Sequence, residues 1–153
     1  MSGVLGTNIV TQIAIIVRDI EAVKSKFADF FGVAPPETID AGEHSVTRTQ
    51  YMGAPAPGAG CKMAFFNAGP GLTLELIQPN GEKSIWQDFL DEKGEGFHHI
   101  AFGVEGTDGK IAACEMFGMT LMQRGKYGDA SGEYAYLDAT RDLKCVIELL
   151  ESY

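Results

Sequence analysis

The chain has 153 residues and a formal net charge of -9; 45% of its residues are hydrophobic and 22% are charged, which is typical of one globular domain or two small modules. The negative charge and the lack of clustered Lys and Arg argue against a nucleic-acid partner and against general attraction to anionic membranes. No segment approaches the roughly 18 apolar residues of a membrane span, and residues 1–8 lack the basic and apolar regions of a secretory signal, so we expect a cytoplasmic protein.

The first half of the chain predicts a strand, a helix and further strands. Residues 13–17 are apolar and mostly β-branched, as in a buried strand. Apolar side chains then recur at helical spacing between Ile20 and Phe31, and Asp19 is a suitable N-cap. Residues 44–60 contain the run APAPGAG and are expected to be an insertion, either a mobile lid or a disordered loop.

A linker and a second set of similar elements follow. The linker contains SIWQDFLDEKG, which predicts a short helix that ends at Gly94. Residues 100–104 predict another short apolar strand. The next helix is expected around residues 110–117, where apolar side chains again share one face.

The two halves can be aligned over most of their length. Residues 12–33 align with 99–120, residues 62–68 with 133–139, and residues 72–78 with 145–151. Such repetition of one strand–helix–strands unit indicates that neighbouring copies share a core. We therefore expect an α+β fold of two tandem βαβββ modules, residues 8–79 and 97–153, with residues 80–96 as a linker that carries the short helix.

Four polar residues occupy equivalent places in the two halves. Gln12 and His99 open the first strand of each half, and Glu75 and Glu148 lie in the last strand of each half. Because strand side chains alternate between faces, each of the four falls on the face opposite the apolar residues that would pack against the helices. The next residues on the same strand face, Ala14 and Ala101, are small, which leaves room for a ligand.

Two buried carboxylates that face one cavity are unfavourable unless a cation compensates them. Desolvation penalises each charge, and mutual repulsion adds to the cost. One divalent ion would cancel the charges of Glu75 and Glu148, with Gln12 and His99 as neutral ligands. Such a ligand set suits Zn, Ni, Co, Mn or Fe(II), with positions left for water or substrate, and oxygen ligands alone do not exclude Mg. The three cysteines contain no CxxC pair, so neither a thiolate zinc site nor a disulfide framework is expected.

The segments GEGFHHIAFGV, LTLELIQP and VIELLE resemble the vicinal oxygen chelate superfamily, which includes glyoxalase I, methylmalonyl-CoA epimerase, extradiol dioxygenases and resistance proteins. The likeness covers almost the whole chain. It implies paired βαβββ modules that form a U-shaped mixed sheet around a metal ion, with helices on the outer face, and it implies a homodimer. It also implies that the metal ligand is the His directly before Ile100, which is His99 and not His98.

Two branches of the superfamily share particular features with this sequence. The segment IWQDFLDEKGEGFHHIAF resembles methylmalonyl-CoA epimerase-like proteins. Those proteins usually carry His in place of Gln12, Gln in place of Glu75, and an extra catalytic Glu near Met63, where this sequence has no acidic residue. The order of the four proposed ligands, Gln, Glu, His, Glu, is instead similar to the ligand order of some glyoxalase I enzymes. No set of glutathione-binding residues can be identified in this sequence.

The resemblance implies a metal-dependent isomerase or epimerase that acts on a small-molecule carbonyl or acyl-thioester substrate. A substrate with two neighbouring oxygens would chelate the ion, and an enediolate would form as the carbon next to the carbonyl loses a proton. We expect Glu148 to be the base that takes this proton, with Glu75 as its counterpart. A glyoxalase I-type lactoylglutathione lyase and a non-catalytic small-molecule binding or resistance protein are the alternatives.

Aromatic and basic residues are weaker candidates. Aromatic side chains in strands and helices either line a pocket or, more usually, belong to the core; those considered are Tyr51, Phe65, Trp86 and Tyr136. Arginines could meet an anionic substrate but are more typical of solvated positions; the four are Arg18, Arg48, Arg124 and Arg141.

Overall fold

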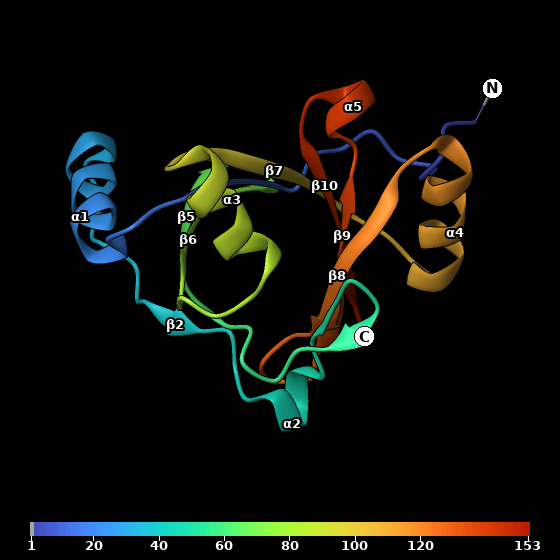
Figure 1. Ribbon diagram of the computed structural model, residues 1–153. Helices are drawn as coiled ribbons and strands as arrows, with labels where there is room; N and C mark the ends of the chain where they lie inside the picture. Colours follow the sequence, from blue (N-terminus) through green and yellow to red (C-terminus); the bar gives the residue numbers. More distant parts are fainter. Residues whose placement is uncertain (1) are drawn as a thin grey trace.

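The computed structural model describes residues 2–153, which form an α+β fold around one curled mixed sheet (Figure 1). The strands of the first half are β1 (Gln12–Ile16), β2 (Ile39–Asp40), β3 (Gln50–Tyr51), β4 (Ala54–Pro55), β5 (Cys61–Gly69) and β6 (Leu72–Pro79). Those of the second half are β7 (Gly96–Gly103), β8 (Thr120–Lys126), β9 (Gly132–Asp138) and β10 (Val146–Ser152). The helices are α1 (Ile20–Phe31), α2 (His44–Thr47), α3 (Ile85–Lys93), α4 (Thr107–Phe117) and α5 (Thr140–Leu143).

The two halves of the sheet have the same topology. The strand order is β2-β5-β6-β1-β7-β10-β9-β8-β3-β4. β1 pairs in parallel with β6, β7 pairs in parallel with β10, and β1 and β7 pair with each other in antiparallel fashion at the centre. Counted outward from the centre, the first half runs β1-β6-β5-β2 and the second half runs β7-β10-β9-β8, so each strand of one half has an equivalent in the other. The expected fold of paired βαβββ units is confirmed. The module boundaries at residues 8–79, 80–96 and 97–153 stay a prediction.

The insertion at residues 44–60 extends the sheet instead of forming a disordered loop. It contains α2, β3 and β4, and β3 pairs with β8 of the second half, with Tyr51 opposite Gln123. The first half of the chain therefore reaches the far edge of the sheet. The run APAPGAG does not reveal this, because the partner strand lies far along the sequence.

α1 lies on the outer face of the first half (Figure 1). It begins as predicted at Asp19, whose side chain accepts a hydrogen bond from Ala22 N at 3.1 Å. It ends at Gly32, where a left-handed φ of 69° lets the N–H bond back to the last turn without a steric penalty. Ile20 and Ala28 then pack in a buried cluster with residues of β5 and β6.

α4 lies on the outer face of the second half (Figure 1) and packs against β9 and β10. It begins at Thr107, earlier than the predicted start near Lys110. The reason is a cap from a distant strand: Glu151 of β10 accepts hydrogen bonds from the N–H groups of Gly106 and Thr107, both at 2.9 Å.

None of the helices within residues 2–153 has the length and hydropathy needed to cross a membrane.

α3, the helix of the linker, packs on the inner face of the curled sheet (Figure 1). Ser84 caps its start by accepting a hydrogen bond from Gln87 N, and Gly94 ends it as predicted. Its buried residues Ile85 and Trp86 belong to a cluster with inward-facing side chains of β1, β6, β9 and β10. The helices expected on the outer face are α1 and α4, whereas α3 fills part of the concave side next to the candidate site.

Candidate metal centre

The alternation of side chains along β6 and β10 directs both carboxylates to the concave face. In β6, Leu76 packs under α1 while Glu75 faces the opposite way; in β10, Leu149 packs under α4 while Glu148 faces inward. Both carboxylates are buried, with 4% and 3% of their surface exposed. This is the arrangement expected from the period-two pattern of the sequence.

The structure brings together Glu75, His99 and Glu148. His99 Nε2 lies 2.9 Å from Glu148 Oε2 and 3.5 Å from Glu75 Oε2, and the three ligand atoms all lie within 4.8 Å of one another. His99 is fully buried. Among the described residues, this is a cluster of three acidic or imidazole groups that can hold a metal ion.

The three inward atoms are not satisfied by one another. His99 Nε2, Glu75 Oε2 and Glu148 Oε2 are buried and have no hydrogen-bond partner of acceptable geometry within residues 2–153. Unpaired buried polar atoms are costly and rare in native proteins. Ligand atoms around a cation have this arrangement, because each lone pair points to the ion and not to a neighbouring residue. The residues present therefore fit a divalent metal ion.

The pKa shifts of Glu75 and His99 also favour a bound cation. Burial raises the pKa of Glu75, and repulsion from Glu148 adds to this effect against the attraction of His99. Burial alone would lower the pKa of His99, but the carboxylates of Glu148 and Glu75 outweigh it and raise that pKa to about 9. Without an ion His99 is therefore protonated on both ring nitrogens at neutral pH, and a divalent cation can take the place of the proton on Nε2.

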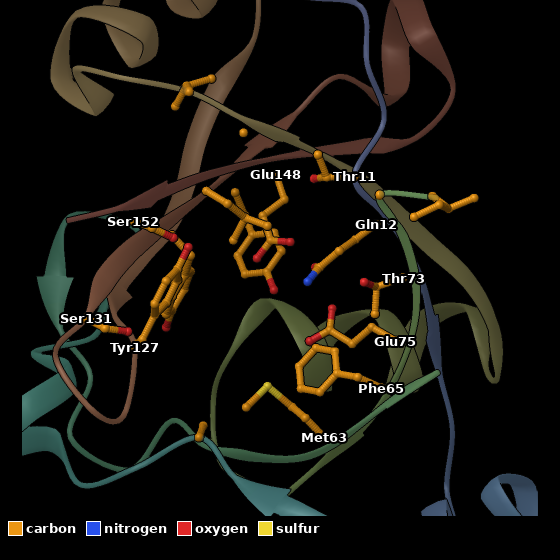
Figure 2. A pocket seen from close by; sticks show the side chains of 18 of the residues that line it. Thr11, Gln12, Met63, Phe65, Thr73, Glu75, Tyr127, Ser131, Glu148 and Ser152 are labelled. Carbon is orange, nitrogen blue, oxygen red and sulfur yellow. The ribbon is translucent and has the colours of Figure 1, made fainter. Parts of the chain in front are cut away.

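Gln12 lies on the neighbouring central strand and points toward the same place. Its side chain extends into the space between Glu75 and Glu148, as Figure 2 shows, and Ala101 of β7 is its partner across the strand pair. Gln12 is half-buried and lines the same cavity as the two carboxylates. The four residues that the duplicated sequence singled out thus face one region.

A β-bulge places His98 beside His99. Ala14 of β1 lies opposite His99 and Ile15 lies opposite Phe97, so His98 is skipped in the pairing. Both histidine rings are therefore buried next to each other, with their Nδ1 atoms 2.9 Å apart. Strict alternation would have put His98 on the outer face, which is why the sequence did not reveal this contact.

A cavity of about 1960 Å³ opens in front of the cluster. Phe65, Trp86 and Tyr136 line this cavity. Tyr51 does not line it, and its hydroxyl donates a hydrogen bond to Asp88 of α3. Polar residues line the wall of the cavity that faces Gln12 and Glu75; Figure 2 shows Tyr127, Ser131 and Ser152 there. These three carry no sequence signal, since they lie in and next to strand ends that only the fold brings together.

None of the four arginines lines the cavity within the described residues. Arg124 forms ion pairs with Asp108 and Glu133, and Arg141 pairs with Asp142. The positive charge at the cavity comes instead from Lys110 and Lys126.

The fold and the site together define a class of protein: paired βαβββ units around a buried Glu/His/Glu cluster that can hold a metal ion. The family model described as the Glyoxalase/Bleomycin resistance protein/Dioxygenase superfamily matches residues 11–136. The chain belongs to this superfamily, whose members are commonly metal-dependent.

Individual relatives are more distant. A Bacillus subtilis (strain 168) protein described as uncharacterised, YqjC, is 33% identical over 90 residues, which is 58% of this chain and only 64% of the length of that relative. A hypothetical protein from Bacillus halodurans C-125 matches 96% of both chains with a TM-score of 0.68 at 22% identity. Methylmalonyl-CoA epimerase from Streptomyces coelicolor, solved with 2-nitronate-propionyl-CoA, matches 94% of this chain and 96% of its own with a TM-score of 0.65 at 22% identity. The structural likenesses establish a shared fold.

Proposed function

We propose that this chain is a metal-dependent enzyme that moves a proton at the carbon next to a carbonyl, as an isomerase or epimerase does. One observation carries the proposal: the inward atoms of Glu75, His99 and Glu148 are buried, close together and without hydrogen-bond partners. Gln12 is proposed as the fourth ligand. The cavity in front of the cluster gives a small molecule access to it.

The four residues have different roles in this proposal. Gln12 and His99 are neutral ligands that stay in place through the reaction. Glu148 is the base that takes the proton, and Glu75 is its counterpart on the other side of the site. A divalent ion, when bound, supplies Lewis-acid stabilisation of the negative charge that develops on the substrate oxygen.

The proposed substrate is a small carbonyl compound or an acyl thioester. The size of the cavity supports this, as does the acyl-CoA compound in the Streptomyces coelicolor epimerase structure. Charges of both signs line the cavity: Lys110 and Lys126 on one hand, and Asp40, Glu105 and Asp129 on the other. A substrate panel therefore needs anionic thioesters as well as short uncharged carbonyl compounds.

A glyoxalase I-type lactoylglutathione lyase is the second candidate. β5 runs beside Glu75, with Phe65 opposite it, and the sequence of this strand, CKMAFFNAG, contains no Asp or Glu. The strand therefore offers no additional acid next to the ligand cluster. The ligand order Gln12, Glu75, His99, Glu148 resembles that of some glyoxalase I enzymes, which supports this candidate.

The ion and the assembly are also proposals. Oxygen and imidazole ligands favour Zn, Ni, Co, Mn or Fe(II). We propose a homodimer, which the molecular mass in solution tests directly. A cytoplasmic location remains a prediction from the sequence.

Metal titration tests the proposed centre. Protein stripped with a chelator is expected to bind one Co(II) per chain, followed by its visible absorption and by calorimetry. Glu75→Gln and Glu148→Gln are expected to weaken binding by more than about 100-fold, because losing even a group that only hydrogen-bonds to a metal ligand costs about 10- to 100-fold. Glu92→Gln, on the exposed side of α3, is the control and should bind as the wild type does.

Proton exchange tests the reaction. The loaded protein, incubated in deuterated water with a panel of carbonyl and thioester compounds, is expected to exchange a carbon-bound proton of one of them. Thioester formation from methylglyoxal and glutathione would favour the lyase. A protein that binds no ion and exchanges no proton would instead be the non-catalytic binding protein.

A further inference from the structure

The two halves of the site differ at one equivalent position. Phe65 lies opposite Glu75 in the pairing of β5 with β6, and Tyr136 lies opposite Glu148 in the pairing of β9 with β10. Both aromatic side chains line the cavity. The duplicated fold therefore sets a phenyl ring beside one carboxylate and a phenol beside the other, and the chemical difference between them is one hydroxyl group.

The hydroxyl of Tyr136 is held in place, but its proton is unused. Trp86 Nε1 donates to the phenol oxygen at 3.2 Å, and the two rings meet edge to face with centroids 6.0 Å apart. Because the indole N–H can only donate, the phenol oxygen is the acceptor and its own O–H stays available. Within residues 2–153 the hydroxyl has no second hydrogen-bond partner.

Tyr136 lies next to the candidate ligands. Its ring centroid is 5.0 Å from that of His99, and only 3% of the residue is exposed. A buried O–H without an acceptor is unfavourable. An acceptor oxygen that enters the cavity with a bound molecule satisfies it.

We infer that Tyr136 is a catalytic hydrogen-bond donor to the substrate oxygen on which negative charge develops. This inference rests on the proposed function. The O–H donates without transferring its proton, so the phenol is the same before and after the reaction. Phe65 offers no such donor at the equivalent place, which makes the second half the polar side of the site and fixes the direction in which a two-oxygen ligand binds.

Binding of acetohydroxamate tests this inference without an enzyme assay. This small ligand has two neighbouring oxygens and carries negative charge when it chelates, and the visible spectrum of the Co(II)-loaded protein reports its binding. Tyr136→Phe is expected to weaken acetohydroxamate binding about tenfold or more, because a hydrogen bond to a charged group is lost. Its Co(II) affinity is expected to stay within about twofold of the wild type, because the metal ligands are untouched.

Two further variants separate this role from a structural one. Tyr134→Phe removes a hydroxyl from the same strand and the same cavity, where it lies 3.3 Å from the Thr49 hydroxyl, and is expected to leave acetohydroxamate binding unchanged. Trp86→Phe removes the donor that orients the Tyr136 hydroxyl and is expected to weaken binding in the same direction as Tyr136→Phe.

Equal acetohydroxamate affinity of loaded wild type and Tyr136→Phe would overturn the inference while leaving the metal centre intact. So would a loaded wild type that does not bind the compound. Failure of Co(II) to bind the wild type would instead overturn the proposed function, so the two failures are distinguishable.

Discussion

The adjacent histidines 98 and 99 have different surroundings, although both are buried. A metal-binding Nε2 on His99 needs a free lone pair, so the hydrogen must sit on Nδ1, and the Nδ1 atom of His98 at 2.9 Å is its acceptor. Burial, together with the neighbouring His99, lowers the pKa of His98 well below its ordinary value, which keeps it neutral and able to accept. His98 is therefore expected to orient His99.

Replacing His98 tests this orientation. His98→Phe leaves the Nδ1–H of His99 without an acceptor, which should lower the free energy of unfolding by about 1–3 kcal/mol. Co(II) affinity should fall about 10- to 100-fold, as is typical when a partner of a metal-bound histidine is lost. His98→Gln retains an acceptor oxygen and should restore part of both losses; equal metal affinity in wild type and His98→Phe would contradict the assignment.

The protonation of His99 makes a second prediction, for the metal-free protein. Its pKa is about 9 in the folded state against an ordinary 6.5. A raised folded pKa adds stability that is fully present below pH 6.5 and is lost as the pH rises through 9. Glu75, whose pKa is also raised, acts in the same direction at lower pH.

Urea unfolding in the presence of a chelator measures this effect. The free energy of unfolding should fall by up to about 3 kcal/mol between pH 6.5 and 9.5. His99→Gln should remove the slope, and so should a bound ion, because it replaces the proton. A stability that is flat or rising over this range in the metal-free wild type would show that His99 is not held by the two carboxylates.

At the scale of elements, local sequence predicted the starts and ends whose capping groups are local. Asp19 caps α1 from the adjacent position, and Gly94 ends α3. The start of α4 could not be predicted, because its cap is Glu151, a carboxylate that arrives from β10 only when the sheet forms.

The α4 cap gives a prediction in acid. Hydrogen bonds from the Thr107 hydroxyl and from the N–H groups of Gly106 and Thr107 lower the pKa of Glu151 to about 2 from 4.5. A lowered folded pKa adds stability that is present above pH 4.5 and is lost as the pH falls toward 2. Glu151→Gln should therefore lower the thermal midpoint at pH 7 and lose less stability than the wild type between pH 4.5 and 2.5. Glu92→Gln, an exposed carboxylate on α3, is the matched control, and identical acid profiles of wild type and Glu151→Gln would contradict the cap.

At the scale of the whole molecule, the repeat predicted the paired halves and the faces of their strands. The concave-face positions of Glu75 and Glu148 follow from alternation alone, because both strands are regular there. The placement of α3 inside the curve and of β3 beside β8 could not be predicted, because both depend on contacts between distant parts of the chain. His98 was missed for a different reason, since one bulge shifts the register.

Because both halves contribute proposed ligands, a bound ion should stabilise them together. At a free ion concentration of about 100 times the dissociation constant, one site adds about 2.7 kcal/mol to the free energy of unfolding. Thermal melts should show one transition that moves upward with added Co(II) in the wild type and stays in place in Glu148→Gln. An equal shift in both proteins would mean that the ion binds elsewhere.

Anomalous diffraction from crystals of the Co(II)-loaded protein would locate the ion itself. One anomalous peak per chain is expected, about 2.0–2.2 Å from His99 Nε2 and from the nearest oxygens of Glu75, Glu148 and Gln12. Loaded crystals with no peak at this cluster, or with the peak on other residues, would show that these four side chains do not hold the ion.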